Sequence, residues 1–325
     1  MSSGSDAPPA FDEPFEAADD FLHESDLHPW WVETWWFSFF APERHLGGWL
    51  FGMARPNQAA STGGAWIWDP SGHEPRCARY FAHYTALPTR MEALRSNPVR
   101  FPSRYQVEVL ESGREYGLTF ADEPAGLDLD LRFTATMPAF GHKSNVAPFY
   151  RSAHYDQAGR VTGRLVVEGE TIDIDCYAMR DRSWGLRSER VVPDFSYCWR
   201  ADADEAFLVY SPRRDGPLVV NRGVLHRDGV SRPIVEGTRR EVRDAVHGWV
   251  TEVAISASDD TGRKVDATGT ALSRLVHPRP TSANTITALR WTLPDGRTSW
   301  GEDQDVWPHE RWKRWMRAAV GGHGT

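Results

Sequence analysis

The segment Arg180-Asp181-Arg182-Ser183-Trp184-Gly185-Leu186-Arg187 gathers cations, one carboxylate, a hydroxyl and an indole directly after a strand-like run. Residues 160–168 and 171–179 are β-prone runs separated by a Glu-Gly-Glu turn, which is typical of a β-hairpin. Side chains alternate between the faces of a strand, so a strand that continues through Asp181 points its two flanking arginines to the opposite face. We interpret this segment as the floor of a binding cavity, at a junction between two β-rich halves of the chain.

The rest of the chain repeats this pattern of short β-prone runs between turn residues. Further strands are predicted at residues 28–40, 48–53, 64–68, 105–110, 116–120, 127–136, 196–199, 206–210, 218–225, 230–238, 249–256, 263–272 and 285–293. Strands this short and this numerous predict an all-β chain built from sandwiches or barrels. A short helix is predicted at residues 89–97. A C-terminal helix follows Trp307-Pro308 and carries Trp312, Trp315 and Met316 on one stripe.

Length and charge limit the classes of protein to which the chain can belong. Its 325 residues exceed the size at which one core usually stops growing, so two domains are expected, at residues 21–187 and 188–325. Residues 1–20 are rich in Ser, Asp, Glu, Ala and Pro and are predicted to be a disordered tail. The formal net charge of −8 argues against nucleic acid or an anionic membrane as a partner. No apolar stretch approaches the length of a membrane span.

The cysteines and the first residues bear on the cellular compartment. Cys77, Cys176 and Cys198 are odd in number and widely spaced, which favours buried free thiols in a reducing compartment over a disulfide framework. The first eleven residues are small, polar and acidic, unlike a secretory signal. We therefore expect a soluble cytoplasmic protein, and the sequence is compatible with a homodimer. The 15 tryptophans predict an unusually aromatic core or cavity.

Two short motifs make the chain resemble a known group of proteins. The run Tyr177-Ala178-Met179-Arg180-Asp181-Arg182-Ser183-Trp184-Gly185, followed by the aromatic run Phe195-Ser196-Tyr197-Cys198-Trp199-Arg200-Ala201, resembles the carotenoid-hydratase superfamily. That superfamily of tandem lipocalin-like proteins includes hydroxyneurosporene synthase, kievitone hydratase, the attachment-protein family and fungal Diels–Alderases. Residues 21–317 look like a bacterial branch of it, marked by an opening Trp-Val-Glu-Thr-Trp and an end at Gly301-Glu302-Asp303-Gln304-Asp305-Val306-Trp307.

The resemblance implies two lipocalin-like β-barrel or sandwich domains in tandem, with a ligand pocket in or between them. It also implies that Asp181 corresponds to the aspartate that protonates an isolated alkene in the hydratases. Those enzymes have a tyrosine two residues before the aspartate, where this chain has Met179, and Tyr177 is the nearest tyrosine. The region that supplies a histidine corresponds to residues 151–156, in which His154 is the only one.

Hydration of a trisubstituted alkene requires a desolvated acid and aromatic rings, because a proton goes to carbon and leaves a tertiary cation. A carboxyl among apolar groups keeps its proton near neutral pH, and indole faces stabilise the cation best. Two carboxyls have suitable neighbours. Asp181 is grouped with Trp184, Trp199 and Tyr197, and the nearby arginines, above all Arg187, would lower its pKa. Glu33 shares a strand face with Trp31 and Trp35 and has no arginine close in sequence, so on chemistry alone it is the better acid.

Each of these groups also has a structural interpretation. Asp181 could form an ion pair with Arg187 or cap the end of a strand, and Glu33 could be a buried carboxylate satisfied by an arginine or by backbone donors. The tryptophans could belong to the core, and His154 could be a hydrogen-bonded histidine at a strand end. The acidic residues Glu302, Asp303 and Asp305 are interpreted as a solvated cluster at the entry to the C-terminal helix, in preference to a metal site with His309.

No nucleotide-binding loop, nucleophile elbow or zinc-binding spacing is present in the sequence, so we expect neither cofactor nor metal. The first functional hypothesis is a cofactor-independent hydratase or dehydratase acting on a terpenoid, prenyl or other lipophilic alkene or tertiary alcohol. Asp181, Glu33 and His154 are its candidate catalytic residues. Its candidate binding residues are Trp184, Trp199, Tyr197, Tyr177, Trp31, Trp35 and Arg187. An isomerase or cyclase in the same pocket and a carrier without chemistry are the alternatives.

Overall fold

The structure, a computed structural model, describes residues 14–25, 27–146, 149–187, 194–213, 217–220, 222–279 and 281–321. Within these residues the chain forms nineteen strands and two α-helices. The strands of the first half are β1 (Trp31–Ala41), β2 (Leu46–Arg55), β3 (Ala60–Trp68), β4 (Tyr80–Pro88), β5 (Val99–Arg100), β6 (Gln106–Glu111), β7 (Glu115–Asp122), β8 (Leu127–Ala135), β9 (Phe140–Val146), β10 (Phe149–Val167) and β11 (Glu170–Arg187). Those of the second half are β12 (Phe195–Ala201), β13 (Glu205–Pro212), β14 (Arg222–Arg227), β15 (Val230–Arg243), β16 (Val250–Asp259), β17 (Lys264–Pro278), β18 (Ser282–Thr292) and β19 (Thr298–Pro308). The helices are α1 (Met91–Leu94) and α2 (His309–Gly321).

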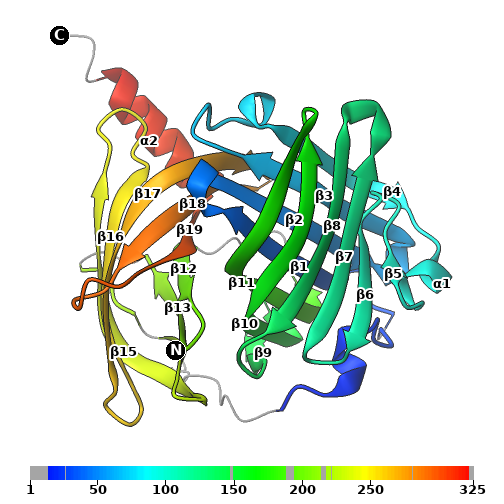
Figure 1. The fold of residues 1–325 in the computed structure, drawn as a ribbon, viewed down its shortest axis with the longest axis horizontal. Coiled ribbons are helices and arrows are strands. Elements are labelled where there is room, and N and C mark those ends of the chain that lie inside the picture. The colour runs from blue at the N-terminus through cyan, green and yellow to red at the C-terminus, as the bar shows by residue number, and fades with distance from the viewer. Residues whose placement is uncertain are drawn as a thin grey trace, which may run out of the picture.

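The strands form one large sheet and one closed barrel, which lie side by side (Figure 1). The eleven-stranded sheet has the order β4-β3-β2-β1-β11-β10-β8-β7-β6-β5, with β9 paired to β10. The barrel runs in sequence order from β12 to β19 and closes through pairing of these two strands. The two long strands β10 and β11 pair with each other within the sheet, and the segment 180–187 is the end of β11. The hydroxyl of Tyr197 on the barrel donates a hydrogen bond to Asp156 of β10, so these strands contact the barrel.

Alternating burial explains why these runs fold as strands. In β8 the apolar side chains Leu127, Leu129, Leu131 and Phe133 are buried, while the polar residues between them are part or fully exposed. Strand β1 differs, because all eleven of its residues are buried. A strand is buried on both sides only when both faces of its sheet are covered, so β1 lies inside the molecule.

The register of β1 against β11 separates two faces of the sheet. Glu33 pairs with Trp184 and Trp35 with Arg182, so these four side chains lie on one face, which we call the inner face. Trp36 pairs with Asp181, on the other face. The predicted separation of Asp181 from its two flanking arginines is therefore confirmed.

The second face of the sheet packs against the outer wall of the barrel. Phe40 contacts Trp199 with ring centroids 5.6 Å apart, and the Nε1 of Trp49 donates a hydrogen bond of 2.7 Å to Glu302 of β19. We call this interface the seam. It joins the side chains of both bodies into one continuous apolar core. A second core fills the barrel interior around Phe207, Val253 and Trp291.

Three local expectations are changed by the structure. The helix predicted at residues 89–97 is a single turn, α1, and the chain leaves the helical conformation before Pro98 and the short strand β5. Residues 17–20, assigned to the tail from composition, form a 3-10 turn whose Asp20 is buried. Cys176 and Cys198 are buried, as expected, whereas Cys77 is exposed.

None of the described helices is long and apolar enough to cross a bilayer.

The acidic residues before α2 are not solvated, which corrects their interpretation as a helix-entry cluster. Glu302, Asp303 and Asp305 belong to β19 and are at most 2% exposed. Asp303 and Asp305 point into the barrel, where arginines bind them. Arg239 forms two hydrogen bonds of 2.7 and 2.9 Å with Asp303. Strand alternation places Glu302 on the opposite side of the barrel wall, in the seam.

Candidate functional site

Asp181 lies in the seam, on the face of the sheet that meets the barrel. Its Oδ1 accepts a hydrogen bond of 3.3 Å from the Oγ1 of Thr34 on the neighbouring strand β1. The same hydroxyl lies 2.5 Å from the Oγ of Ser183. Within the described part of the chain, no arginine lies at ion-pair distance from Asp181. Arg187 instead donates a hydrogen bond of 3.1 Å to Ser183.

A second carboxylate, Asp156, anchors a cluster of aromatic donors beside Asp181. The hydroxyl of Tyr197 donates to its Oδ1 at 2.8 Å, and the hydroxyl of Tyr210 lies 3.1 Å from its Oδ2. The Nε2 of His154 lies 3.1 Å from Oδ2 and 2.9 Å from the hydroxyl of Tyr210. The imidazole, the carboxylate and the two phenols therefore form one hydrogen-bonded network.

Strand pairing brings the two halves of this site together. Asp156 of β10 is the direct cross-strand partner of Asp181 on β11, and His154 is the partner of Ser183. The two tyrosines come from the barrel wall, on the adjacent strands β12 and β13, where Tyr197 and Tyr210 are themselves partners. The sheet therefore supplies the acidic groups and the histidine. The barrel supplies the phenols.

The environment favours a protonated carboxyl at Asp181. Burial raises its pKa and the charge of Asp156 adds to this effect, whereas His154, Arg187 and the Thr34 hydroxyl act in the opposite direction. Burial alone would lower the pKa of His154, but the adjacent Asp156 outweighs it, so the pKa of the imidazole is raised. The pKa values of Tyr197 and Tyr210 are raised well above the ordinary range, first by burial and then by Asp156.

Within the described residues, this end of the seam is less buried than its interior. The side chain of His154 is 23% exposed, and Asp181, Arg187 and Tyr210 are also only partly buried. Beyond it, buried aromatic side chains line the interior of the seam.

Glu33 lies on the inner face, away from Asp181, and it is ion-paired. Its carboxylate, which is fully buried, contacts the guanidinium of Arg182 at 2.5 Å. It also accepts hydrogen bonds from the Nε1 of Trp31 at 3.1 Å and from the backbone N–H of His23 at 2.9 Å. Burial raises its pKa, but Arg182 and His23 outweigh that effect and the pKa is lowered. The expectation that Glu33 retains its proton is therefore wrong, because Arg182 pairs with it. That arginine lies on β11, which is far from β1 in sequence but next to it in the sheet.

The candidate binding residues divide between the two faces. Trp31, Trp35 and Trp184 lie on the inner face with Glu33, where the guanidinium of Arg182 stacks 3.8 Å from the ring of Trp35. Trp199 and Tyr197 lie in the seam, as does Arg187 at its less buried end. Tyr177 lies further along β11, partly buried against the core. Of these candidates, Tyr197 and Arg187 interact with Asp181.

Sequence reasoning missed four residues of this site, namely Thr34, Trp36, Asp156 and Tyr210. Strand alternation alone could have indicated Trp36 and Thr34, because they take the opposite face of β1 from Glu33. Asp156 lies two residues after His154, on the same face of a strand. Nothing in the sequence indicates that β13 lies against β10, so Tyr210 could not have been found.

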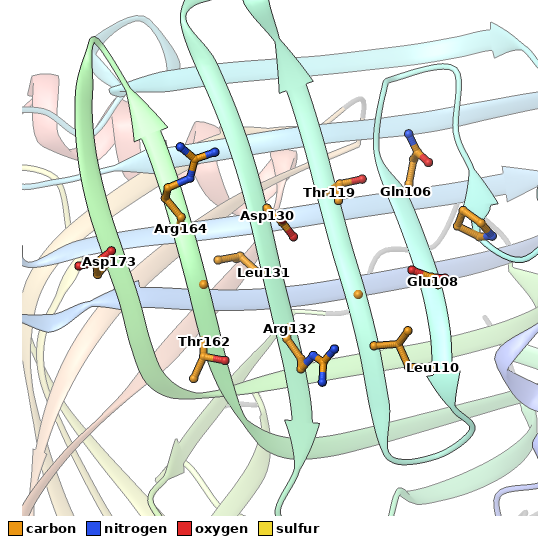
Figure 2. A pocket seen from close by; sticks show the side chains of 13 residues that line it. Gln106, Glu108, Leu110, Thr119, Asp130, Leu131, Arg132, Thr162, Arg164 and Asp173 are labelled. Carbon is orange, nitrogen blue, oxygen red and sulfur yellow. The ribbon is translucent and has the colours of Figure 1, made fainter.

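The structure also has a hollow of about 640 Å³, on the exposed part of the sheet (Figure 2). Side chains of both charges surround it, including Glu108, Asp130, Arg132 and Arg164. It contains none of the candidate site residues, and its open polar walls suit a lipophilic ligand poorly. Among the described residues, no group of three or more His, Cys, Asp or Glu side chains is arranged to hold a metal ion.

Comparisons with known proteins identify the family of this chain and solved structures with a similar fold. Residues 16–303 match the family described as domain of unknown function DUF7064. A comparison with curated proteins finds no match. Among solved structures, an AttH protein of Nitrosomonas europaea aligns with a TM-score of 0.64 at 15% identity, over 92% of this chain and 98% of that one. CghA aligns with a TM-score of 0.55 at 13% identity, over 86% and 89% of the two chains. Kievitone hydratase of Nectria haematococca aligns with a TM-score of 0.52 at 10% identity, over 86% and 90%.

These similarities confirm the all-β, lipocalin-like fold with a short C-terminal helix that the sequence predicted. At such identities the likeness concerns the fold and not the reaction, because one fold supports many chemistries. Function has to be argued from the seam.

Proposed function

We propose that this chain, a member of the DUF7064 family, is a cofactor-independent hydratase or dehydratase of a lipophilic alkene or tertiary alcohol. The similarity of its fold to that of kievitone hydratase is compatible with this class of reaction. The observation that carries the proposal is the state of Asp181. It is a carboxyl of raised pKa, with no arginine in direct contact among the described residues, beside a histidine and two phenols.

In the hydration direction, Asp181 donates its proton to the less substituted alkene carbon, and the π electrons form the new C–H bond. The adjacent carbon becomes a tertiary cation. Trp36, the cross-strand neighbour of Asp181, and Tyr197 lie with ring centroids 6.4 Å apart and offer aromatic faces to that cation. A positioned acid of this kind contributes about 10²–10⁴-fold to a rate.

Water then adds to the cation through its oxygen, and the resulting oxonium ion loses a proton. His154 accepts this proton. Its contact with Asp156 raises the pKa of the imidazole and so makes it a stronger base. His154 then releases its proton to solvent and Asp181 takes one from solvent, which returns both groups to their starting states. Dehydration of a tertiary alcohol follows the same steps in reverse, and no electrons are gained or lost overall.

The surroundings of the acid favour an apolar substrate. Trp36, Tyr197 and the partly buried Phe195 are aromatic, and the seam continues inward as a fully buried apolar core. Such a surface binds prenyl and terpenoid chains through the hydrophobic effect, while the small polar network fixes one reacting end.

The proposal is tested by incubating the protein with acyclic terpenes and their tertiary alcohols in ¹⁸O-labelled water. We expect label in the alcohol with wild type and a loss of about 10²-fold or more in Asp181→Asn. Asp175→Asn is the matched control, because Asp175 lies on the same strand and face but is exposed and paired with Arg160. Its rate should equal that of wild type. Absence of label from every substrate would refute the proposal, and so would an unchanged rate in Asp181→Asn.

A further inference from the structure

Glu302 is a second carboxyl of the seam, deeper than Asp181. It is 0% exposed. Its Oε2 accepts a hydrogen bond of 2.7 Å from the Nε1 of Trp49, across the interface between barrel and sheet. Its Oε1 makes no hydrogen bond of ordinary geometry among the described residues, and the side-chain amide of Gln304 is the one further donor close enough to affect the carboxyl. An oxygen buried in this way is costly to leave without a partner, so it needs an explanation.

The neighbouring buried carboxylates of β19 are paired with arginines. Asp303, the next residue, is bound by two nitrogens of Arg239. Asp305 contacts Arg213 at 2.8 Å and Arg243 at 2.7 Å. Both of these side chains point into the barrel, whereas Glu302 points out of it. The chain therefore supplies guanidinium groups to two of three neighbouring carboxylates and none, in the described residues, to the third.

Other polar atoms near Glu302 also lack partners. Trp49 packs on Trp66 with ring centroids 5.4 Å apart, and Trp66 packs on His277 at 4.5 Å. Neither ring nitrogen of His277 has a hydrogen-bond partner in the described structure, nor does the indole nitrogen of Trp66. The ring centroids of His83 and His277 lie 4.7 Å apart, and the buried Nδ1 of His83 has no hydrogen-bond partner among the described residues. A row of stacked rings, Trp49, Trp66 and His277, thus runs from Glu302 along the inner part of the seam and carries polar atoms without hydrogen-bond partners among the described residues.

The charge states of these groups define what they can bind. Burial raises the pKa of Glu302 to about 8, and the donors Trp49 and Gln304 offset only part of that effect. Burial lowers the pKa of His83 to about 4 and that of His277 well below its ordinary value. All three side chains are uncharged near neutral pH. Uncharged donors and acceptors suit an uncharged oxygen function, such as a hydroxyl or a carbonyl.

Strand β12 links Glu302 to the Asp156 network. Trp199 is the cross-strand partner of Glu302, and Tyr197 of the Asp156 network precedes it by two residues on β12. Two residues of an extended strand span about 7 Å. An apolar stretch of the substrate would lie against Trp36 and Trp199 between the two polar ends.

We propose that the Oε1 of Glu302 is the anchor for an uncharged hydroxyl or carbonyl group of the substrate, bound in the inner seam. The substrate is then an amphiphilic molecule with an oxygen function at one end and the reacting alkene or alcohol at the other. This inference rests on the proposed function in placing a ligand in the seam, but it does not depend on the identity of the acid.

The test compares the binding of geraniol with that of the matching hydrocarbon that lacks the hydroxyl, followed by tryptophan fluorescence. Wild type should bind geraniol about tenfold more tightly, which corresponds to about one good hydrogen bond. Glu302→Gln should keep this preference, because an amide retains a donor of the same shape. Glu302→Leu should lose it, since an apolar side chain of similar size cannot replace the hydrogen bond.

Equal affinity of wild type for the two probes would overturn the inference, as would failure of both to bind or a preference that survives in Glu302→Leu. Infrared spectroscopy gives a reading that does not depend on turnover. One carbonyl stretch of a protonated carboxylic acid should shift on addition of geraniol, and that band should be missing from Glu302→Gln but present in Asp181→Asn. Asp181→Asn separates the two proposals, because it should lose label incorporation and keep the preference for geraniol. If it kept both, the proposed function would fail and the anchor would stand.

Discussion

Replacement of Glu302 by glutamine should change the pH dependence of stability in a way that can be calculated from the structure. Burial without an ion-pair partner raises the pKa of Glu302 from its ordinary 4.5 to about 8 in the folded protein. Because the pKa is higher in the folded protein, the carboxyl loses its proton at a lower pH in the unfolded chain than in the folded protein. The contribution of Glu302 to the free energy of unfolding is therefore fully present below about pH 4.5 and is lost as the pH rises towards 8.

The size of this loss follows from the two pKa values. The full difference corresponds to about 5 kcal/mol at 1.36 kcal/mol for each pKa unit. About 3–4 kcal/mol of it falls between pH 5 and pH 8. Glutamine has the shape of the protonated acid and cannot ionise, so this contribution is absent from Glu302→Gln. The variant should be the more stable protein at pH 8, and the two proteins should approach each other in stability at pH 5.

Urea denaturation of both proteins at about pH 5 and about pH 8 measures this difference directly. Subtraction of the two curves removes the contributions of all other titrating groups, which the proteins share. Curves that run parallel across this pH range would refute the reasoning, because they would show that Glu302 ionises as freely in the folded protein as in the unfolded chain.

Three further variants test the remaining interactions. Glu33→Gln should destabilise the protein by about 3–5 kcal/mol in urea denaturation, because it leaves Arg182 buried without its counter-charge, yet label incorporation per folded molecule should persist. A large loss of that activity would return Glu33 to the mechanism. Arg239→Met should cost a similar amount, since Asp303 is then an uncompensated charge in the barrel, and a change below about 1 kcal/mol would contradict the pairing. Tyr197→Phe removes a buried hydrogen bond to a carboxylate and should cost about 1.5–3 kcal/mol, and an unchanged stability would show that the hydroxyl is not a donor in the folded protein.

Much of the fold could be predicted from sequence because strand signals are local. The alternation of Leu127, Leu129 and Leu131 with polar residues defines β8 without reference to the rest of the chain. The same reasoning correctly separated Asp181 from Arg180 and Arg182. Alternation does not show which face of a strand meets a second body, and this is what places one set of aromatic residues in the seam.

The partners of buried charges were the main element that could not be predicted. Glu33 and Arg182 are 149 residues apart in sequence, and only the pairing of β1 with β11 brings them together. The acidic run around Glu302 suggests exposure on composition, since three acidic groups near a helix start are usually solvated. Arginines at positions 213, 239 and 243 reverse that expectation inside the barrel. Without knowledge of the barrel closure, no sequence pattern indicates which carboxyl is paired and which is left neutral.

The most direct test of the central claim is carbon-bound deuterium in the product of a reaction run in D₂O. If Asp181 delivers the proton, wild type should convert the alkene to an alcohol that carries one deuterium on the carbon next to the alcohol carbon. The rate should fall as the pH rises through the raised pKa of that carboxyl. Asp181→Asn should form this product at least about 10²-fold more slowly, while Asp175→Asn should match wild type. Equal deuterium incorporation by wild type and Asp181→Asn would contradict the account.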